Sequence, residues 1–194
     1  MKIVYIIGPS CSGKDTIFTE LTRIYNGILN PIILYTDRPI RPNEIDGKNY
    51  YFRTPEQMDE LTRNRKVIEK RVYETANGPW SYATVDDGSF IETENYIGIG
   101  TLESLKALQE YFGRESIVPL YIQVEPEIRF TRAFLRELNG RKDFKELCRR
   151  WITDSIDFSE DKIEEVQPLF INNNTDIKSA VEEAIRIINK HLKL

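Results

Sequence analysis

A glycine-bracketed turn near the start of the chain constrains the fold more than any other feature. The apolar run Ile3–Ile7 precedes it, and Ile17-Phe18 opens an amphipathic segment after it. Glycines let successive backbone N–H groups point inward, and a following helix adds its positive N-terminal end, so this order of strand, turn and helix predicts a phosphate-binding loop. The turn reads Gly8-Pro9-Ser10-Cys11-Ser12-Gly13-Lys14-Asp15-Thr16.

One position departs from the usual phosphate-loop pattern. The pattern places Ser or Thr directly after the lysine, where the hydroxyl binds Mg²⁺, whereas here Asp15 follows Lys14 and a hydroxyl comes only at Thr16. A glycine turn that merely caps a helix is the alternative interpretation. The order of strand, two glycines, lysine and helix favours a loop that holds ATP, with Lys14 between the outer phosphates.

The composition predicts one cytoplasmic domain with insertions. The chain has 194 residues, of which 40% are hydrophobic and 30% charged, and it runs from Met1-Lys2 into the first apolar run without a signal-type region. A net charge of -4 and a pI of about 5.3 argue against nonspecific binding to nucleic acid or to an anionic membrane, because both need a basic surface. Cys11 and Cys148 have neither zinc-site nor disulfide spacing.

Apolar runs alternate with helical patterns along the chain. Segments 102–108 and 177–188 carry apolar residues at helical spacing. Strands that alternate with helices predict an α/β fold with a doubly wound parallel sheet. Besides Ile3–Ile7, the expected strands are residues 32–35, 96–100, 120–124 and 169–171.

Two excursions interrupt this alternation. Roughly sixty residues separate the second and third expected strands, far more than a normal connection, so we expect segment 34–85 to be a substrate-binding subdomain. The charged segment 136–150 contains the turn signal Asn139-Gly140 and predicts a lid. The chain is then a single domain, 1–194, whose core comprises residues 1–33, 86–135 and 151–194.

The first excursion carries a dense motif. Two arginines three positions apart are followed by an acid, a glycine and a tyrosine. The motif resembles the acceptor-phosphate motif of guanylate kinases, T-x-R-x-x-R-x-x-E-x-x-G-x-x-Y-x-F, at every fixed position. The resemblance implies that segment 34–85 binds the phosphoryl acceptor. The matching residues are Thr36, Arg38, Arg41, Glu44, Gly47, Tyr50 and Phe52.

Arg38, Arg41 and Tyr50 form the expected clamp on the acceptor's phosphate. Each guanidinium can donate two parallel hydrogen bonds to a phosphate, and the tyrosine hydroxyl can donate another. In the alternative interpretation, Glu44 and Asp46 simply neutralise the two arginines in a solvated loop. The prolines in this segment favour a rigid anion clamp.

In guanylate kinases a glutamate on a strand and a later Tyr-Gly-Ser/Thr run hold the guanine base and more of the phosphate. Glu69 and Tyr82-Ala83-Thr84 are the counterparts, although the segment between them is a few residues longer here. One carboxylate can accept from the ring N–H and the amino group of guanine together. The resemblance therefore places Glu69 on the base and Tyr82 with the phosphate clamp, and it makes Thr84 a further acceptor-binding residue. Alternatively, Glu69 only faces solvent.

Arg136, Arg141 and Arg150 are the expected lid arginines. Guanylate kinases use such arginines to grip the donor phosphates, since converging cations neutralise the transferring group while a lid excludes water. The spacing around Arg141 differs slightly from the family, and each arginine alone could belong to a solvated face. Asn172 matches a family turn near the donor adenine, although consecutive asparagines also form ordinary loops.

The chain departs from the family at positions that serve the base. Guanylate kinases carry L-D-I-D at the end of the third core strand, whereas here the strand reads Ile97-Gly98-Ile99-Gly100, and Leu34 stands where the family usually has a serine. Each lost neutral contact is worth about 0.5–1.5 kcal/mol, which predicts weaker or differently built guanine selectivity. With those acids absent, we hypothesise that Asp15 supplies a carboxylate near Mg²⁺ beside the Thr16 hydroxyl. The alternative is that Asp15 only favours the helix dipole.

Together these motifs predict a nucleoside monophosphate kinase that transfers the γ-phosphoryl group of ATP, with Mg²⁺, to GMP or dGMP. Lys14, Arg38 and the lid arginines are the expected catalytic residues, and His191 is expected to be structural or exposed. Gly98 and Lys14-Asp15 also resemble ribose 1,5-bisphosphate phosphokinases, so a sugar-phosphate kinase is one alternative and a noncatalytic guanylate-kinase-like binding module is another. We expect a monomer or homodimer whose partners are small molecules, not nucleic acid or membrane.

Overall fold

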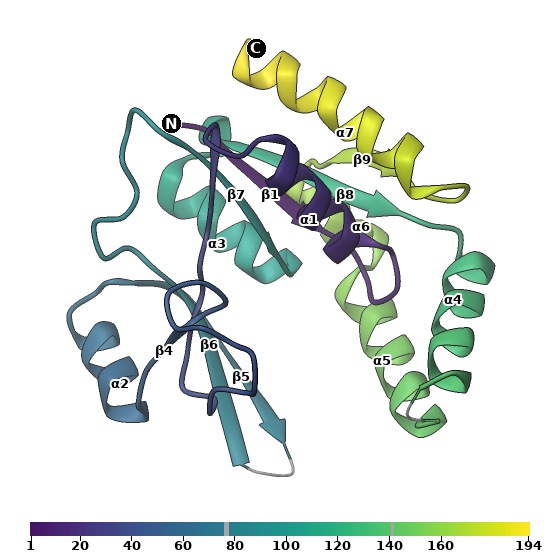
Figure 1. Ribbon diagram of the computed structural model, residues 1–194, viewed down its shortest axis with the longest axis horizontal. Coiled ribbons are helices and arrows are strands. Elements are labelled where there is room, and N and C mark those ends of the chain that lie inside the picture. The colour runs from purple at the N-terminus through teal and green to yellow at the C-terminus, as the bar shows by residue number, and fades with distance from the viewer. Residues whose placement is uncertain (76–77, 141) are drawn as a thin grey trace.

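Two β-sheets organise the chain, and the computed structural model describes residues 1–75, 78–140 and 142–194 (Figure 1). The five-stranded sheet is parallel throughout, in the order β2-β7-β1-β8-β9. The four-stranded sheet has the order β4-β3-β6-β5. The strands are β1 (Ile3–Ile7), β2 (Leu29–Pro31), β3 (Tyr35–Thr36), β4 (Tyr51–Phe52), β5 (Val67–Thr75), β6 (Gly78–Val85), β7 (Asn95–Gly100), β8 (Ile117–Gln123) and β9 (Leu169–Asn172).

Local signals fix where several helices begin. Thr54 and Thr101 each cap a helix by accepting from the backbone N–H three residues later, and Pro126 occupies a first-turn position that needs no N–H donor. No helix in the described ranges is long and apolar enough to span a bilayer. The α-helices are α1 (Lys14–Ile24), α2 (Pro55–Arg63), α3 (Leu102–Phe112), α4 (Pro126–Leu138), α5 (Phe144–Asp157), α6 (Glu160–Val166) and α7 (Ile177–Leu192), with a 3₁₀ turn at Arg114–Ser116.

Helices cover both faces of the parallel sheet. Along β1, Val4 and Ile6 point into a core shared with α1 and α7, whereas Ile3, Tyr5 and Ile7 point into a core shared with α3 and α6. Because a buried parallel strand must be apolar on both faces, β1 reads as a continuous hydrophobic run. The predicted α/β, doubly wound parallel sheet is therefore confirmed.

The prediction of a single second strand over residues 32–35 is wrong. β2 ends at Pro31 in the parallel sheet, and Tyr35 begins β3 in the other sheet. Ile32 donates from its backbone N–H to Ile97 O at 2.8 Å, after which the chain crosses between the sheets. Residues 32–34 are half-buried in that crossing, which explains an apolar run without strand pairing.

Two projections extend from the same side of the core (Figure 1). One is the four-stranded sheet, where β5 and β6 form a long antiparallel hairpin and α2 packs Met58 into a small core with Tyr35 and Ala83. The other is the pair α4 and α5. The phosphate loop at the end of β1 lies beside the second projection, since Ser10 bonds Asp154 of α5.

Candidate active site

The phosphate loop joins β1 to α1 through two glycines that no other residue could replace without strain. Gly8 has φ 155°, and a Cβ added there would lie 2.9 Å from Ser12 Oγ and 3.1 Å from Ile122 O. Gly13 has φ 90°, and its added Cβ would lie 2.5 Å from Asn173 Nδ2. The loop therefore depends on glycine for both its backbone conformation and its close packing.

Asn173 supports this loop from the end of β9. Its Nδ2 donates to Ser12 O at 2.7 Å, and its backbone N–H donates to Gln123 O. Within the described residues, Asn173 Oδ1 and Ser12 Oγ are buried without a hydrogen-bond partner, which is costly unless a ligand or water satisfies them. Asn172, the asparagine predicted from sequence, is exposed and instead accepts from Asn174 N through its Oδ1. Asn173 belongs to the same predicted turn, Ile171-Asn172-Asn173, but was not among the predicted site residues.

Lys14, Asp15 and Thr16 form the first turn of α1. Lys14 Nζ lies 3.7 Å from Asp15 Oδ2, and the Asp15 side chain is 85% exposed. Asp15 lines a cavity of about 1100 Å³ together with Tyr50 from the acceptor motif. The start of the phosphate-loop helix and part of the expected clamp thus face one space.

An arginine and an aspartate from α4 and α5 anchor the tip of the loop. Asp154 accepts from Ser10 N at 3.0 Å and from Arg129 Nη1 at 3.0 Å. Arg129 is 10% exposed and stacks over Trp151 with its guanidinium carbon 3.8 Å from the ring centroid. These contacts fix α4 and α5 against the loop. Arg129 was not predicted, because in the sequence it is only one more arginine in a charged segment.

Two of the expected lid arginines lie near this anchor. Arg136 and Arg150 line the same hollow as Ser10 and Cys11 of the phosphate loop. Arg150 also donates to Glu146 Oε1 at 2.8 Å. Arg141, the third expected lid arginine, lies outside the described residues.

On the acceptor side, Arg38 is held in a rigid frame. Its Nη1 and Nη2 donate to the two Glu44 oxygens at 3.0 and 2.8 Å, and its Nε donates to Tyr82 Oη at 3.2 Å. The Arg38 side chain is only 3% exposed, and the Glu44 hydrogen bonds raise its pKa. Glu44 therefore positions the Arg38 guanidinium but also accepts hydrogen bonds from both of its terminal nitrogens.

Tyr50 and Arg41 complete the cluster expected to bind the phosphate. The Tyr50 ring packs edge-on against Tyr82 at 5.7 Å, and Arg38 lies 5.3 Å from the Tyr50 centroid. Burial raises the pKa of Tyr50, so its hydroxyl stays protonated and can donate. Arg41 is exposed, and its backbone N–H donates to Glu44 Oε2. Asp46 pairs with Arg53 instead of either clamp arginine.

Glu69 and Thr84 face each other across β5 and β6. Thr84 Oγ1 donates to Glu69 Oε1 at 2.8 Å, and Arg71 donates to the same carboxylate from Nε at 3.0 Å and from Nη2 at 3.3 Å. Glu69 is 7% exposed, so the solvent-facing interpretation is wrong. Sequence reasoning missed Arg71, although its spacing of two from Glu69 along a strand puts both on one face.

Comparison with known proteins agrees with this geometry. The family model for guanylate kinase matches residues 1–87. The guanylate kinase of Wolbachia pipientis wMel is 28% identical over 97% of this chain and 89% of its own length, and that of Mycoplasma mobile is 29% identical over 100% and 80%. The crystal structure of guanylate kinase from Anaplasma phagocytophilum, at 18% identity, covers 97% of this chain and 85% of its own, with a TM-score of 0.68. By sequence, the chain is therefore similar to guanylate kinases over nearly its whole length, and it shares their fold.

Within the guanylate kinase family pattern, the missing acids at Gly98 and Gly100 have a structural cause. The ring of Tyr5 on β1 lies over both glycines, and a Cβ added at Gly98 would lie 2.6 Å from Tyr5 Cε2. The Tyr5 hydroxyl donates to Ser104 Oγ at 3.0 Å, and burial raises its pKa to about 12. A neutral tyrosine therefore fills the space in which the family's strand-end carboxylates would stand.

Proposed function

We propose that this protein is a guanylate kinase that transfers the γ-phosphoryl group of ATP to the phosphate of GMP or dGMP, giving ADP and GDP or dGDP. The observation that carries the proposal is the phosphate loop, in which both glycines have positive φ and the buried Ser12 Oγ has no partner among the described residues. A cavity of about 1100 Å³ that follows α1 from Asp15 to Asn26 also contacts Tyr50 of the acceptor motif. Phosphoryl transfer requires donor and acceptor in line.

On the donor side, we assign the phosphates to residues 8–16. Backbone N–H groups of the loop and the N-terminal end of α1 favour anions, and Lys14 adds a mobile cation. Ser12 Oγ is buried, has no partner in the described ranges and suits a phosphate oxygen. Arg136 and Arg150 join from the lid segment 136–150, and Arg141 and Asn172 stay predictions.

On the acceptor side, we assign the phosphate of GMP to Arg38, Arg41, Tyr50 and Tyr82 in the subdomain 34–85. Glu44 and Tyr82 preorganise Arg38, so little conformational entropy is lost when the phosphate binds. The acceptor phosphate oxygen is already ionised and needs no general base. These residues align that oxygen while the donor-side cations stabilise the charge of the transferring group.

Mg²⁺ fits the oxygen donors in the first turn of α1. Asp15 and Thr16 would hold it, together with phosphate oxygens and water, which are the ligands that Mg²⁺ prefers. When bound, the ion neutralises charge on the β- and γ-phosphates. The Asp15 carboxylate is exposed beside Lys14, which supports its assignment as the acid that replaces those missing at Gly98 and Gly100.

Substitution Asp15→Asn tests the metal assignment. Because the amide is a neutral and weaker ligand, we expect the Mg²⁺ concentration for half-maximal turnover to rise about tenfold. Turnover is measured against MgCl₂ at fixed ATP, with Glu20→Gln on the same helix as the matched control. Unchanged turnover and unchanged Mg²⁺ dependence in Asp15→Asn would leave Asp15 only its role at the helix N-terminus.

A coupled ADP-release assay tests the proposed reaction. The panel of acceptors is GMP, dGMP, AMP, CMP, UMP and ribose 1,5-bisphosphate, each with ATP and Mg²⁺. We expect GMP and dGMP to give the fastest turnover. Fastest turnover with ribose 1,5-bisphosphate would favour the sugar-phosphate kinase, and no turnover with any acceptor would favour a noncatalytic binding module.

A further inference from the structure

Glu69, the residue assigned to the base, already accepts several hydrogen bonds within the protein. A carboxylate has about four lone-pair sites, and Glu69 uses three of them, on Arg71 Nε, Arg71 Nη2 and Thr84 Oγ1. The remaining site is on Oε2. Glu69 can therefore accept one further hydrogen bond without losing an existing contact, whereas the ring N–H and amino group of guanine would need two.

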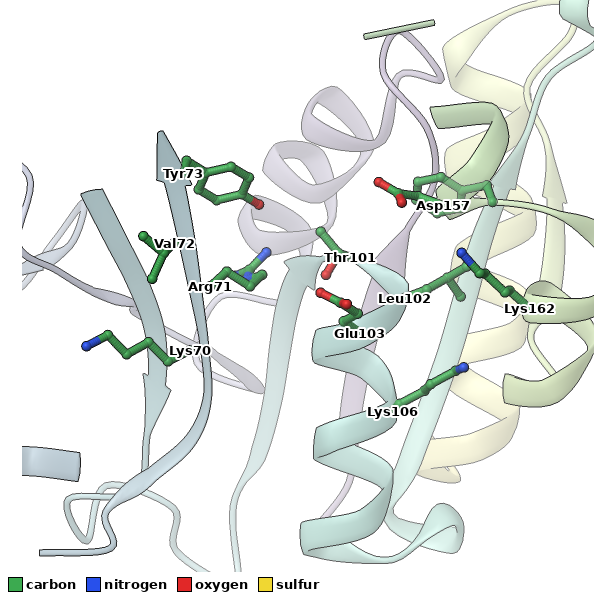
Figure 2. A pocket seen from close by; sticks show the side chains of 11 residues that line it. Lys70, Arg71, Val72, Tyr73, Thr101, Leu102, Glu103, Lys106, Asp157 and Lys162 are labelled. Carbon is green, nitrogen blue, oxygen red and sulfur yellow. The ribbon is translucent and has the colours of Figure 1, made fainter. Parts of the chain in front are cut away.

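Arg71 has N–H donors that Glu69 does not occupy and that a bound base could use. Arginine has five N–H donors, and Glu69 accepts two of those on Arg71. The Arg71 side chain lines a cavity of about 450 Å³ together with Tyr73 and Thr101. Figure 2 shows the guanidinium between β5 and the first turn of α3, on the side of Thr101 and Glu103. Its further donors have room for a ligand.

This donor and acceptor pair lies on the same face as the phosphate clamp. Arg71 pairs with Tyr82 across β5 and β6, and Glu69 pairs with Thr84, so all four side chains point to one side of the hairpin. Tyr82 in turn contacts Arg38 and the Tyr73 ring. Residues two apart on a strand are about 7 Å apart, so a nucleotide held at Tyr82 can reach Glu69.

We propose that Arg71 is a specificity-determining residue that donates to the O6 carbonyl oxygen of the acceptor's purine, while Glu69 accepts from the adjacent N1–H. This inference rests on the proposed function and names the substrate class as the 6-oxopurine nucleoside monophosphates, GMP and IMP. The 2-amino group of guanine is left with no assigned partner. Adenine has an amino group at the position of O6. Both this amino group and the Arg71 guanidinium are hydrogen-bond donors, so no hydrogen bond forms between them and AMP is rejected.

The pair also accounts for the departures at the base site. Leu34 cannot donate to a base carbonyl as the family's serine does, and Tyr5 fills the space over Gly98 and Gly100. Arg71 supplies the missing carbonyl donor from β5. The Glu69 carboxylate neutralises the charge of the mostly buried Arg71 side chain, which lowers the free-energy cost of burying that charge.

Steady-state kinetics with ATP and three acceptors tests the inference. In the wild-type protein we expect kcat/KM for IMP within about tenfold of that for GMP, and both about 100-fold or more above AMP. Arg71→Met should lower kcat/KM for GMP and IMP by about tenfold or more and leave AMP little changed. Arg63→Met, on the exposed last turn of α2, is the matched control and should change none of the three.

Two results would overturn the inference. One is a wild-type preference for GMP over IMP well above tenfold, since Glu69 would then hold the amino group. The other is an unchanged GMP-to-AMP ratio in Arg71→Met. If thermal unfolding shows that this variant does not fold, Arg71→Lys keeps the charge beside Glu69 without the fork and should lower the same ratio. Absence of turnover with GMP in the wild type contradicts the proposed function itself.

Discussion

Replacing Lys14 by methionine should reduce kcat for GMP phosphorylation by about 100-fold to 1000-fold. Methionine keeps the length and much of the apolar stem but removes the charge that stabilises the developing negative charge on the transferring phosphoryl group. The side chain is 20% exposed, and its ion pair within the described residues is the 3.7 Å contact with Asp15, so its removal should not unfold the loop. Turnover is measured by ADP release at saturating ATP and GMP.

The control for this variant is Lys178→Met on α7. Lys178 is 85% exposed and its ion pair with Glu182 measures 3.9 Å, so the change removes the same charge far from the loop. We expect turnover within about twofold of the wild type. A Lys14→Met protein that keeps its native unfolding temperature and also retains wild-type turnover would refute the assignment of the donor site.

Introducing the family's acid at position 98 should destabilise the protein by about 3 kcal/mol or more. Gly98→Asp places a Cβ 2.6 Å from the ring of Tyr5, which is fully buried, and adds a charge inside the core. The free energy of unfolding is measured by denaturant titration. Gly98→Ala tests the steric part alone and should cost about 1–3 kcal/mol.

Two further variants distinguish this cause from a general intolerance of substitutions. Thr93→Asp adds the same charge at an exposed position just before β7 and should change the free energy of unfolding by less than about 0.5 kcal/mol. In the background Tyr5→Leu, which removes much of the ring, Gly98→Ala should cost at least about 1 kcal/mol less than in the wild type. Equal costs in the two backgrounds would show that Tyr5 does not explain the glycine.

The sequence predicted the core because its signals are local. Apolar runs such as Ile3–Ile7 and the turn from Gly8 to Lys14 depend on residues adjacent in the chain, and the structure forms a strand, a loop and a helix there. The same kind of signal wrongly predicted one strand over residues 32–35, because half-buried side chains in the crossing between two sheets produce the same apolar run as a strand.

The site was harder to predict because its contacts join distant segments. Asn173 reaches the phosphate loop from 161 positions away, and Asp154 reaches Ser10 from 144 positions away. No local pattern records such pairs. In the sequence, Tyr5 is only one more residue of an apolar strand, but in the structure its ring leaves no space for a side chain at position 98.

The most direct test of the central claim is a product analysis with ATP and GMP as the two substrates. Ion-exchange chromatography follows ATP, ADP, GMP and GDP over time in the presence of Mg²⁺. We expect GDP and ADP to appear in equal amounts while GMP and ATP disappear at the same rate. ADP without GDP, or no loss of either substrate, would contradict phosphoryl transfer between the phosphate loop and the Arg38 clamp.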